Sequence, residues 1–405
     1  MPNCCPIKAE KKTAHFFSFK NFPLQTTPIN KKKITYLYKN FSRKKLFTNL
    51  HYNYCKNCDH IFLKNPPKQK VMNFLYKNFY NYPSPLLTKT NPQRDNFFLQ
   101  IFNKFFHTVL KKNKNKNKNL LEVGCYDGYI LSKLNKNYNV YGVDPSKGAL
   151  IGKKFGLNIK RDFFSFAKFK KSVGKYNVIL ARHFLEHLKN PSIFLNDCNK
   201  ILSSSGYIII EVPNVTHYLK VGSVEIFSPQ HIQCFSRMSL TKILLQSRFS
   251  VKKIIEKNGN LIVLAKKNVK EKKISKKNNF ALVKNFKKKF LILQNNLKKI
   301  IEKKETNSRI LLWGAGSFCS SFFGTFDINL DRIKYVIDSD DTKSKLKFVN
   351  FNLKIISKKI AKKMKPKTII ITSYYSSDII KTIKKMNLKC NIVTIFPKFK
   401  HLLLK

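Results

Sequence analysis

The feature of this sequence that most constrains its fold is a succession of short apolar runs between Asn119 and Lys267, separated by amphipathic stretches. A parallel strand is apolar on both faces, and the connection to the next parallel strand is a helix with one apolar side. The pattern therefore predicts an α/β fold with a largely parallel sheet and crossover helices. The predicted strands are Leu120–Val123, Val140–Val143, Asn177–Ala181, Tyr207–Val212 and Leu261–Ala265.

The rest of the chain divides around this unit, and 405 residues are enough for two or three domains. The N-terminal part carries two cysteine groups and few regular periods. The C-terminal part begins a second αβ unit, with strands predicted at Arg309–Trp313 and Lys334–Ile337 on either side of a Gly314-Ala315-Gly316 turn. We predict five segments: a cysteine-containing module at 1–70, a helical connector at 71–118, the central domain at 119–267, a linker helix at 268–306 and a second αβ domain at 307–405.

The predicted linker helix carries an apolar stripe with spacings of three and four residues. One side of a single long helix produces this pattern. Two interpretations stay open: the stripe packs on the domains that the helix joins, or it forms the seam of a homodimer. The chain is accordingly expected to be a monomer or a homodimer. The stripe consists of Val283, Phe286, Phe290, Leu293, Leu297 and Ile300.

A glycine turn follows the first strand of the central domain. Gly124 and Gly128 flank Tyr126 there, and glycine suits a turn where the backbone approaches a ligand closely. The spacing differs from the dinucleotide fingerprint G-x-G-x-x-G because position 126 is Tyr, which favours a ligand without a pyrophosphate. Asp144 ends the second strand, where a carboxylate can accept hydrogen bonds from ribose hydroxyls. Asp162 follows a third short apolar run and is a candidate partner for an adenine amino group.

The stretch Glu122–Leu131, EVGCYDGYIL, resembles the first motif of class I S-adenosylmethionine methyltransferases. More narrowly, the chain is similar to sugar C-methyltransferases, which have an N-terminal zinc-binding module, a central methyltransferase domain and a C-terminal Rossmann-like domain. The resemblance covers most of the chain. It implies S-adenosylmethionine as the cofactor and a nucleotide-linked keto sugar as the small-molecule substrate. The expected cofactor-binding residues are Glu122, Gly124, Tyr126, Asp127, Gly128, Asp144, Asp162 and His183.

Methyl transfer to carbon requires a base, and histidine titrates in the useful range. The stretch Arg182–His187 follows a predicted strand and resembles the family's R-H-x-x-E-H. The resemblance implies that His187 is an acid–base residue. A Glu–His pair on a turn can also be purely structural. His231 matches the end of the family's Tyr-x-Glu-His, but Ser228 and Gln230 replace the Tyr and the Glu. Three alternatives therefore stay open: O- or N-methylation of another small metabolite, a different ketone substrate, or a catalytically degenerate scaffold.

Two cysteine groups lie in the N-terminal module. Cys55 and Cys58 form a C-x-x-C knuckle, whose thiolates can share a tetrahedral zinc ion. The resemblance implies an earlier C-x-x-C pair, but Lys8 stands where its second cysteine is expected. Cys5 is the remaining candidate of that pair, and Cys4 or His60 could supply the missing ligand. A structural zinc is therefore one hypothesis, and an eroded site or core thiols are the other.

The net charge of +59 comes from 80 Lys and Arg against 21 Asp and Glu. Such an excess suits a nucleic acid or another polyanion. However, only eight of the basic residues are Arg, the residue that reads phosphate and bases best, and the lysines are spread over the whole chain. Nucleic-acid methylation is thus the least favoured alternative. No run approaches the roughly 18 apolar residues of a spanning helix, so we expect no membrane partner and a soluble, cytoplasmic enzyme.

Overall fold

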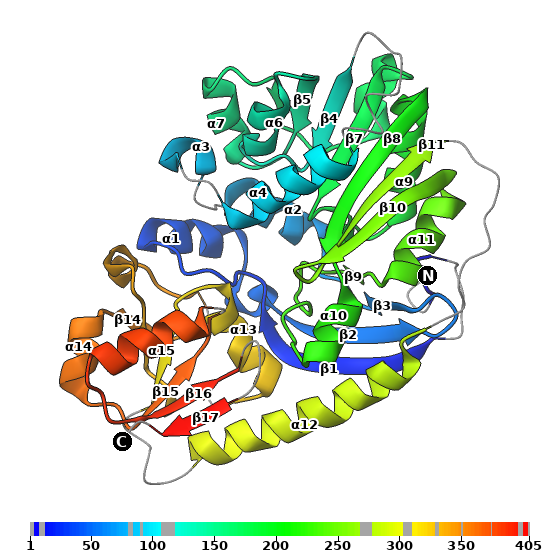
Figure 1. Cartoon of the computed structure of the whole chain (residues 1–405). Helices are drawn as coiled ribbons and strands as arrows, with labels where there is room; N and C mark the ends of the chain where they lie inside the picture. The colour runs from blue at the N-terminus through cyan, green and yellow to red at the C-terminus, as the bar shows by residue number, and fades with distance from the viewer. Residues whose placement is uncertain are drawn as a thin grey trace.

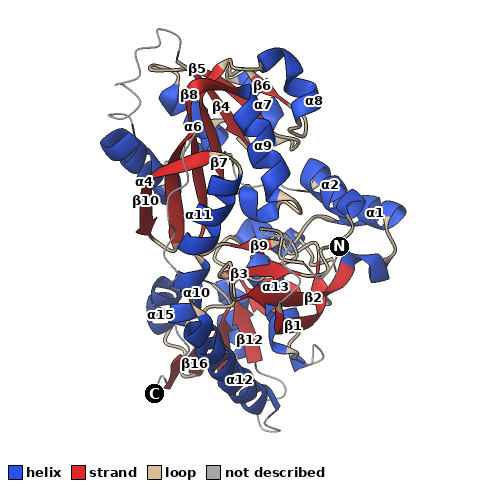
Figure 2. Ribbon diagram, turned by 90° about the vertical axis from the view of Figure 1, so that its right-hand side faces the viewer, coloured by secondary structure: helices blue, strands red, loops and turns tan. Residues whose placement is uncertain are grey.

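The computed structural model describes most of the chain and contains three β-sheets, which Figure 1 and Figure 2 show from two sides. In Figure 2 the sheet built from the N-terminal strands lies between the central sheet and the C-terminal sheet. The described residues are 4–7, 13–79, 84–89, 92–106, 118–267, 278–302, 310–328, 332–349, 351–373, 375–395 and 400–403.

The N-terminal part forms an antiparallel sheet in the order β1-β2-β3-β9. Regular strands were not expected there. The fourth strand, β9, comes from the central part of the chain, so the loop that carries His231 is held against the N-terminal sheet. The elements of the N-terminal sheet and the helices beside it are β1 (Ala14–Pro23), α1 (Lys31–Asn40), a 3-10 turn (Arg43–Leu46), β2 (Phe47–Cys55), β3 (His60–Leu63) and β9 (Gln233–Cys234).

Three helices connect this sheet to the central one. They are α2 (Gln69–Asn78), α3 (Pro85–Thr88) and α4 (Gln93–Ile101), and a π-helical turn at Phe102–Phe106 follows them. The helical character predicted for the connector therefore holds in its described parts. The lysine–asparagine repeat that ends the connector lies outside the described residues.

The central sheet has seven strands in the order β10-β11-β8-β7-β4-β5-β6. From β6 to β8 the strands are parallel and follow the doubly wound order, with the topological switch point between β4 and β7. The hairpin of β10 and β11 pairs antiparallel with β8. The five predicted strands all form. The strands are β4 (Asn119–Val123), β5 (Asn139–Val143), β6 (Ile159–Lys160), β7 (Tyr176–Arg182), β8 (Leu202–Pro213), β10 (Phe249–Lys257) and β11 (Asn260–Lys267).

Helices cover both faces of this sheet, and the buried side chains of the strands form two apolar clusters, one on each face. The helices and turns are α6 (Tyr129–Leu134), α7 (Gly148–Lys154), α8 (Phe166–Phe169) with a 3-10 turn (Lys170–Ser172), a second 3-10 turn (Leu185–His187), α9 (Pro191–Ile201), α10 (Val215–Val221) and α11 (Arg237–Gln246).

The C-terminal sheet has the order β14-β13-β12-β15-β16-β17, parallel except for the last strand. It repeats the doubly wound pattern of the central sheet. Helix α13 of this domain packs on β1. The elements are β12 (Ile310–Trp313), α13 (Ser317–Phe326), β13 (Tyr335–Ile337), a 3-10 turn (Asp341–Lys345), β14 (Lys354–Ile356), α14 (Lys358–Met364), β15 (Thr368–Ile371), α15 (Ser376–Lys385), β16 (Asn391–Thr394) and β17 (Lys400–Leu403).

The long helix α12 (Phe280–Glu302) runs beneath the N-terminal sheet in Figure 1. Four residues of its predicted stripe are buried, and Leu293 and Ile300 pack against the same core cluster. The cluster includes phenylalanines of β1 and α13. The stripe is therefore filled from within the chain, as the first of the two interpretations expects. The buried stripe residues are Val283, Phe286, Phe290 and Leu297.

Candidate active site

The turn after β4 gathers most of the expected cofactor residues. Gly124 and Gly128 have positive φ angles of 78° and 79°, and Tyr126 between them has 51°. A Cβ on Gly124 would lie 2.9 Å from Phe184 Cδ2, and one on Gly128 would lie 2.6 Å from Ile159 Cδ1. The glycines therefore serve both the backbone conformation and close packing of the turn.

Two carboxylates hold the turn in place. Asp144, at the end of β5, accepts the Tyr126 backbone N–H on Oδ2 at 3.0 Å and the Ser146 N–H on Oδ1 at 2.8 Å. Asp127 accepts the Ser84 hydroxyl on Oδ2 at 2.5 Å and the Tyr129 N–H on Oδ1 at 3.0 Å. Both side chains are buried. The Asp127 carboxylate thus fastens the segment before α3 to the glycine turn.

Glu122 differs from these two carboxylates because one of its oxygens has no partner. Its Oε2 atom is buried and receives no hydrogen bond within the described part of the chain. Burial raises the pKa of Glu122 to about 8, and Asp127 and Asp144 push it the same way, while Arg182 opposes them. In a chain of charge +59 this is a locally acidic site.

An acidic site with an unsatisfied carboxyl suits S-adenosylmethionine, whose sulfonium and ammonium groups are both cationic. An ammonium group beside Glu122 would supply the missing donor and favour the ionised carboxylate. The donor set therefore fits the expected cofactor. Asp162 lies two strands away from β4, after β6, where its partly exposed carboxylate pairs with Lys168. That ion pair lowers the pKa of Asp162.

A buried ion network lies at the carboxyl ends of β7 and β8. Arg182 donates from Nε to Glu211 Oε2 at 2.8 Å and from an Nη atom to Asp95 Oδ1 at 2.9 Å. Asp95 belongs to α4, so the network fastens this helix to the sheet. Burial alone would raise the pKa of Glu211. Arg182 and His183 outweigh burial and hold this pKa well below its ordinary value. Sequence reasoning missed Asp95 and Glu211 because neither belongs to a recognisable motif.

His183 lies between two carboxylates of this region. Its Nδ1 is 3.5 Å from Glu186 Oε1, and its Nε2 is 3.5 Å from Glu211 Oε1. Burial acts to lower the pKa of His183, but the two carboxylates outweigh it, and the net shift is upward. His183 therefore takes part in the charge network of the strand ends.

His187 and His231 come together from separate segments, with ring centroids 5.2 Å apart. Each is oriented by a backbone carbonyl: Nδ1 lies 2.8 Å from Gln230 O for His187 and 2.8 Å from Ile226 O for His231. A carbonyl can only accept, so Nδ1 carries a proton in both rings, and in the neutral form of His231 the Nε2 atom has a free lone pair. His187 Nε2 lies 4.0 Å from Glu186 Oε1. Burial lowers the pKa of His231 to about 4, and His187 adds to this shift. A neutral imidazole with a bare Nε2 is the form that acts as a base.

Glu186 lies beside this pair and is buried, without a hydrogen-bond partner on either carboxyl oxygen in the described part of the chain. One ligand atom each from Glu186, His187 and His231 lie within 4.8 Å of one another. Two imidazoles and a carboxylate at this separation can hold a divalent cation as well as move a proton. Both uses are chemically open to these side chains.

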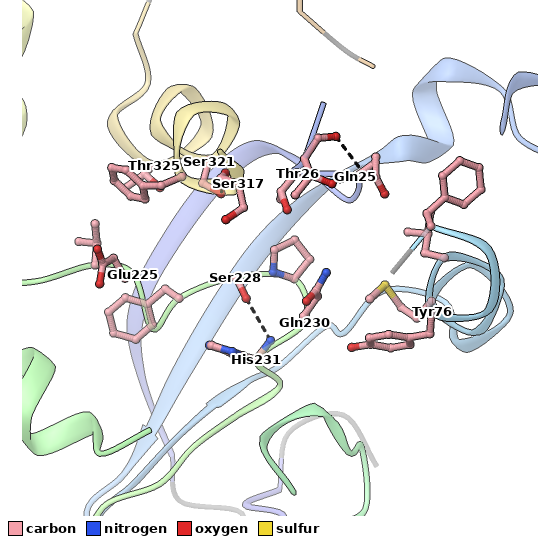
Figure 3. Close-up of a pocket in the computed structure, with 18 residues that line it drawn as sticks. Gln25, Thr26, Tyr76, Glu225, Ser228, Gln230, His231, Ser317, Ser321 and Thr325 are labelled. Atoms are coloured by element: carbon pink, nitrogen blue, oxygen red, sulfur yellow. Dashed lines mark hydrogen bonds between the residues drawn. The ribbon is translucent and has the colours of Figure 1, made fainter. Parts of the chain in front are cut away.

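A cavity of about 230 Å³ adjoins His231. It lies between the N-terminal sheet, α2, the loop before β9 and α13, so all three parts of the chain contribute to it (Figure 3). Tyr76 of α2 lines it and places its ring 6.1 Å from that of His187. Tyr76 was not singled out from the sequence, where it is one of 17 tyrosines. Residues that line the cavity include Gln25, Thr26, Tyr76, Glu225, Ser228, Gln230, His231, Ser317, Ser321 and Thr325.

The cysteines of the N-terminal part form a separate cluster. One sulfur each from Cys5, Cys55 and Cys58 lie within 4.8 Å of one another, and all three residues are buried. Cys4 is half-buried and is not a member of the group. Three converging thiols are a donor set that zinc prefers. Lys8 lies outside the described residues.

Two family models match successive parts of the chain. A model described as a methyltransferase domain matches residues 93–253. A model described as a C-methyltransferase C-terminal domain matches residues 252–397. The first contains the glycine turn and both histidines of the pair, and the second contains α12 and the C-terminal sheet except its last strand, β17.

Solved structures similar to the chain include several methyltransferases. A protein from Pyrococcus horikoshii is 14% identical, with a TM-score of 0.36, and the match covers 45% of this chain and 96% of that one. An S-adenosylmethionine-dependent methyltransferase from Aquifex aeolicus is 16% identical, with a TM-score of 0.33, covering 46% of this chain and 99% of that one. A search of the curated proteins found no significant match.

Within the described residues, no helix combines the length and the apolar character needed to cross a bilayer. The two matched domains follow one another over the site described above, and the donor set at Glu122 suits the sulfonium cofactor. The chain is an S-adenosylmethionine-dependent methyltransferase that carries a C-methyltransferase C-terminal domain.

Proposed function

We propose that the enzyme methylates a carbon atom of a nucleotide-linked keto sugar, with His231, His187 or both as the acid–base groups. The observation that carries the proposal is the pair of imidazoles, in which His231 lines the cavity and each Nδ1 donates to a backbone carbonyl. A carbon next to a ketone is acidic enough for such a base because the enolate spreads its charge onto oxygen.

The proposed roles follow from the positions of the side chains. Glu122 binds the amino group of the cofactor, and Asp144 receives the ribose hydroxyls with the lone pairs that its two backbone donors leave free. When bound, S-adenosylmethionine supplies the methyl group as an electrophile on sulfur. His231 Nε2 removes the proton from the acceptor carbon; that carbon then forms the new C–C bond while the S–CH₃ bond breaks. The imidazolium later returns its proton to water.

The decisive test uses S-adenosylmethionine with a deuterated methyl group and a panel of nucleoside-diphosphate-linked 3-keto and 4-keto hexoses. Mass spectrometry should detect one labelled methyl group on carbon in at least one of them. A folded enzyme that binds the cofactor but labels none of the sugars would refute the proposed substrate class. In D₂O, the same acceptor should exchange its acidic carbon-bound hydrogen, and His231→Gln should abolish this exchange.

A second candidate is methyl transfer to oxygen, which the Glu186–His187–His231 group favours. A divalent cation held there would lower the pKa of an acceptor hydroxyl, and the imidazoles would then be ligands rather than bases. Dialysis against EDTA distinguishes the candidates. Loss of activity that Mg²⁺ or Mn²⁺ alone restores supports the second candidate, whereas activity unaffected by EDTA supports the first.

We also propose that Cys5, Cys55 and Cys58 hold a structural zinc ion in the N-terminal module. The three buried thiols converge, as a tetrahedral site requires, and the cluster is remote in sequence from the acid–base residues. Zinc there would fasten the N-terminal residues around Cys5 to the hairpin of β2 and β3. A direct measurement of zinc content tests this part of the proposal.

A further inference from the structure

Glu225 is a half-buried acidic residue that the roles above do not use. It lies in the loop between α10 and β9, and its side chain lines the cavity (Figure 3). Both carboxyl oxygens are shielded from solvent, and no hydrogen bond from the described residues reaches either of them. The Ser223 hydroxyl instead accepts the backbone N–H of Glu225 at 3.5 Å. Because an unpaired buried carboxyl is costly, its partner is expected to come from a ligand.

The remainder of the cavity lining suits an uncharged ligand. Its polar groups are mainly hydroxyls and amides, among them Thr26, Ser228, Ser317 and Gln230. The chain has 80 Lys and Arg, yet none of the described lining residues is either of these. A bound phosphate needs cations or several N–H donors around it. The first turn of α13 offers N–H groups near Ser317, but no Lys or Arg accompanies them among the described lining residues, and at the Glu225 side of the cavity a phosphate would meet a carboxyl group.

The protonation state of Glu225 also favours a ligand without phosphate at this position. Burial raises the pKa of Glu225 to about 8. At neutral pH an empty cavity therefore holds mainly the neutral acid, which can donate one hydrogen bond and accept others. An ammonium group would instead favour the carboxylate. Both forms bind a hydroxyl or an amine, and neither suits a phosphate.

We propose that Glu225 binds a hydroxyl or amino group of the methyl acceptor, so that the cavity holds the phosphate-free, sugar part of that molecule. Figure 3 shows Glu225 on the side of the cavity near Thr325 of α13, with His231 nearer the middle and Tyr76 on the opposite side. An acceptor anchored at Glu225 would extend toward the bare Nε2 of His231. Glu225 therefore determines which acceptor binds and how it is oriented, and the base remains His231. The inference rests on the proposed function in one respect, that this cavity receives the acceptor.

The test measures binding of three probes by ligand-observed NMR, which requires no turnover: D-glucose, D-glucosamine and D-glucose 1-phosphate. The wild type should bind glucosamine more tightly than glucose, and glucose 1-phosphate about tenfold more weakly than glucose or worse. Glu225→Gln should keep glucose binding within about threefold and lose the preference for glucosamine, because an amide still forms hydrogen bonds but cannot ionise. Glu225→Leu should weaken binding of both sugars by about tenfold.

The matched control is Asp327→Asn, which removes one acidic charge at the exposed end of α13, outside the cavity. Asp327 has a positive φ of 52°, which asparagine tolerates. The Asp327→Asn variant should bind the three probes with the same affinities as the wild type. Thermal melting verifies that each variant is folded.

Two results would overturn the proposal: wild-type binding of glucose 1-phosphate as tight as that of glucose, or unchanged sugar binding in folded Glu225→Leu. Failure of all three probes to bind the wild type would also overturn it. These outcomes are separable from failure of the proposed function. Labelled methyl transfer to a keto sugar with an unchanged KM in Glu225→Leu would refute only the role of Glu225. Sugar binding without any methyl transfer would refute only the function.

Discussion

At the scale of single residues, the carboxyl groups of Glu122 and Glu225 differ from the structural acids around them because they have buried oxygens without a partner among the described residues. Burial raises the pKa of each to about 8. Asp127 and Asp144, by contrast, are supplied with backbone or hydroxyl donors. Unsatisfied acids in a folded chain indicate places where a ligand completes the structure.

Replacing Glu122 by Gln should alter stability and cofactor binding in opposite directions. The pKa of Glu122 rises from its ordinary value of 4.5 to about 8 on folding. Between these pH values the unfolded chain releases a proton that the folded chain retains, so this group makes unfolding easier as pH rises. Glu122→Gln lacks this effect. The melting temperature of Glu122→Gln minus that of the wild type should therefore be larger at pH 8 than at pH 5. The corresponding change in the free energy of unfolding is on the order of a few kcal/mol at most.

The same variant should bind S-adenosylmethionine about tenfold more weakly or worse, because it loses the charge-assisted bond to the amino group. Differential scanning fluorimetry at the two pH values and calorimetry with the cofactor check both statements. A melting difference that does not change with pH would show that Glu122 is ionised in the folded chain.

His231→Gln should remove the base while it keeps a side chain of similar size. We expect kcat to fall by roughly 10²- to 10⁴-fold, as for the loss of a general base, with no change in cofactor affinity. The control is His217→Gln, a histidine outside the cavity, which should retain wild-type activity. Steady-state kinetics with the labelled product test this. A His231→Gln enzyme of normal kcat would contradict the proposed role.

At the scale of elements, the same device appears in both parallel sheets. An acid at the end of the second strand accepts the backbone N–H of the turn after the first strand: Asp144 from Tyr126 at 3.0 Å, and Asp338 from Ala315 at 2.8 Å. In the C-terminal domain, Lys343 also pairs with Asp338, at 2.9 Å. In each sheet the acid therefore holds the turn in place, whether or not a ligand binds there.

The glycines of the C-terminal turn provide a matched pair of substitutions. Gly314 has a φ of +112°, and a Cβ there would lie 2.8 Å from the backbone oxygen of Thr372, which cannot move away easily. Gly316 has open space around its Cβ position and an ordinary φ of −108°. Gly314→Ala should destabilise the protein by about 1–3 kcal/mol, and Gly316→Ala should be close to neutral. Urea unfolding checks this, and equal stabilities for the two variants would contradict the packing argument.

The sequence predicted the elements whose signal is local. Strands β4, β5, β7, β8 and β11 are apolar runs buried on both faces, so each could be recognised without its neighbours. The edge strand β10 was missed because its charged residues come in two adjacent pairs, Lys252-Lys253 and Glu256-Lys257, which interrupt both an apolar run and an alternating pattern. The N-terminal sheet was missed because register shifts between His15 and Phe17 and between Phe19 and Phe22 break the alternation of β1, and because its fourth strand comes from about 170 residues further along the chain.

The residues of the candidate site also fall into two groups, those that belong to local motifs and those that packing brings together. The cofactor turn and the R-H-x-x-E-H stretch are motifs of contiguous residues, and the sequence alone indicated them. Asp95, Tyr76 and Glu225 acquire their positions only when α4, α2 and the loop before β9 pack against the strand ends. No spacing along the chain signals such contacts.

At the scale of the whole molecule, the cavity depends on three parts of the chain holding together. The N-terminal sheet packs against α13 and α12, and it pairs with β9 next to His231. His231, which precedes β9, and its neighbour His187 are therefore coupled to the N-terminal part through its sheet. Disturbing that part is expected to affect acceptor binding more than cofactor binding.

Removal of zinc tests this coupling. Purified protein should contain about one zinc ion per chain by elemental analysis, and Cys58→Ser should contain much less. Zinc loss should lower the melting temperature and raise KM for the acceptor, while S-adenosylmethionine affinity stays near wild type. Cys390→Ser, which changes a cysteine of the C-terminal domain, is the control. Protein that is free of zinc and melts normally would show that the cluster consists of core thiols.

The measurement that tests the central claim most directly is calorimetric titration of S-adenosylmethionine into the wild type, Asp144→Ala and His231→Gln. The structure predicts one bound cofactor per wild-type chain, affinity weakened by about tenfold or more in Asp144→Ala, and unchanged affinity in His231→Gln. The absence of binding to the folded wild type, or equal affinity in Asp144→Ala, would contradict a cofactor site built around Glu122 and Asp144.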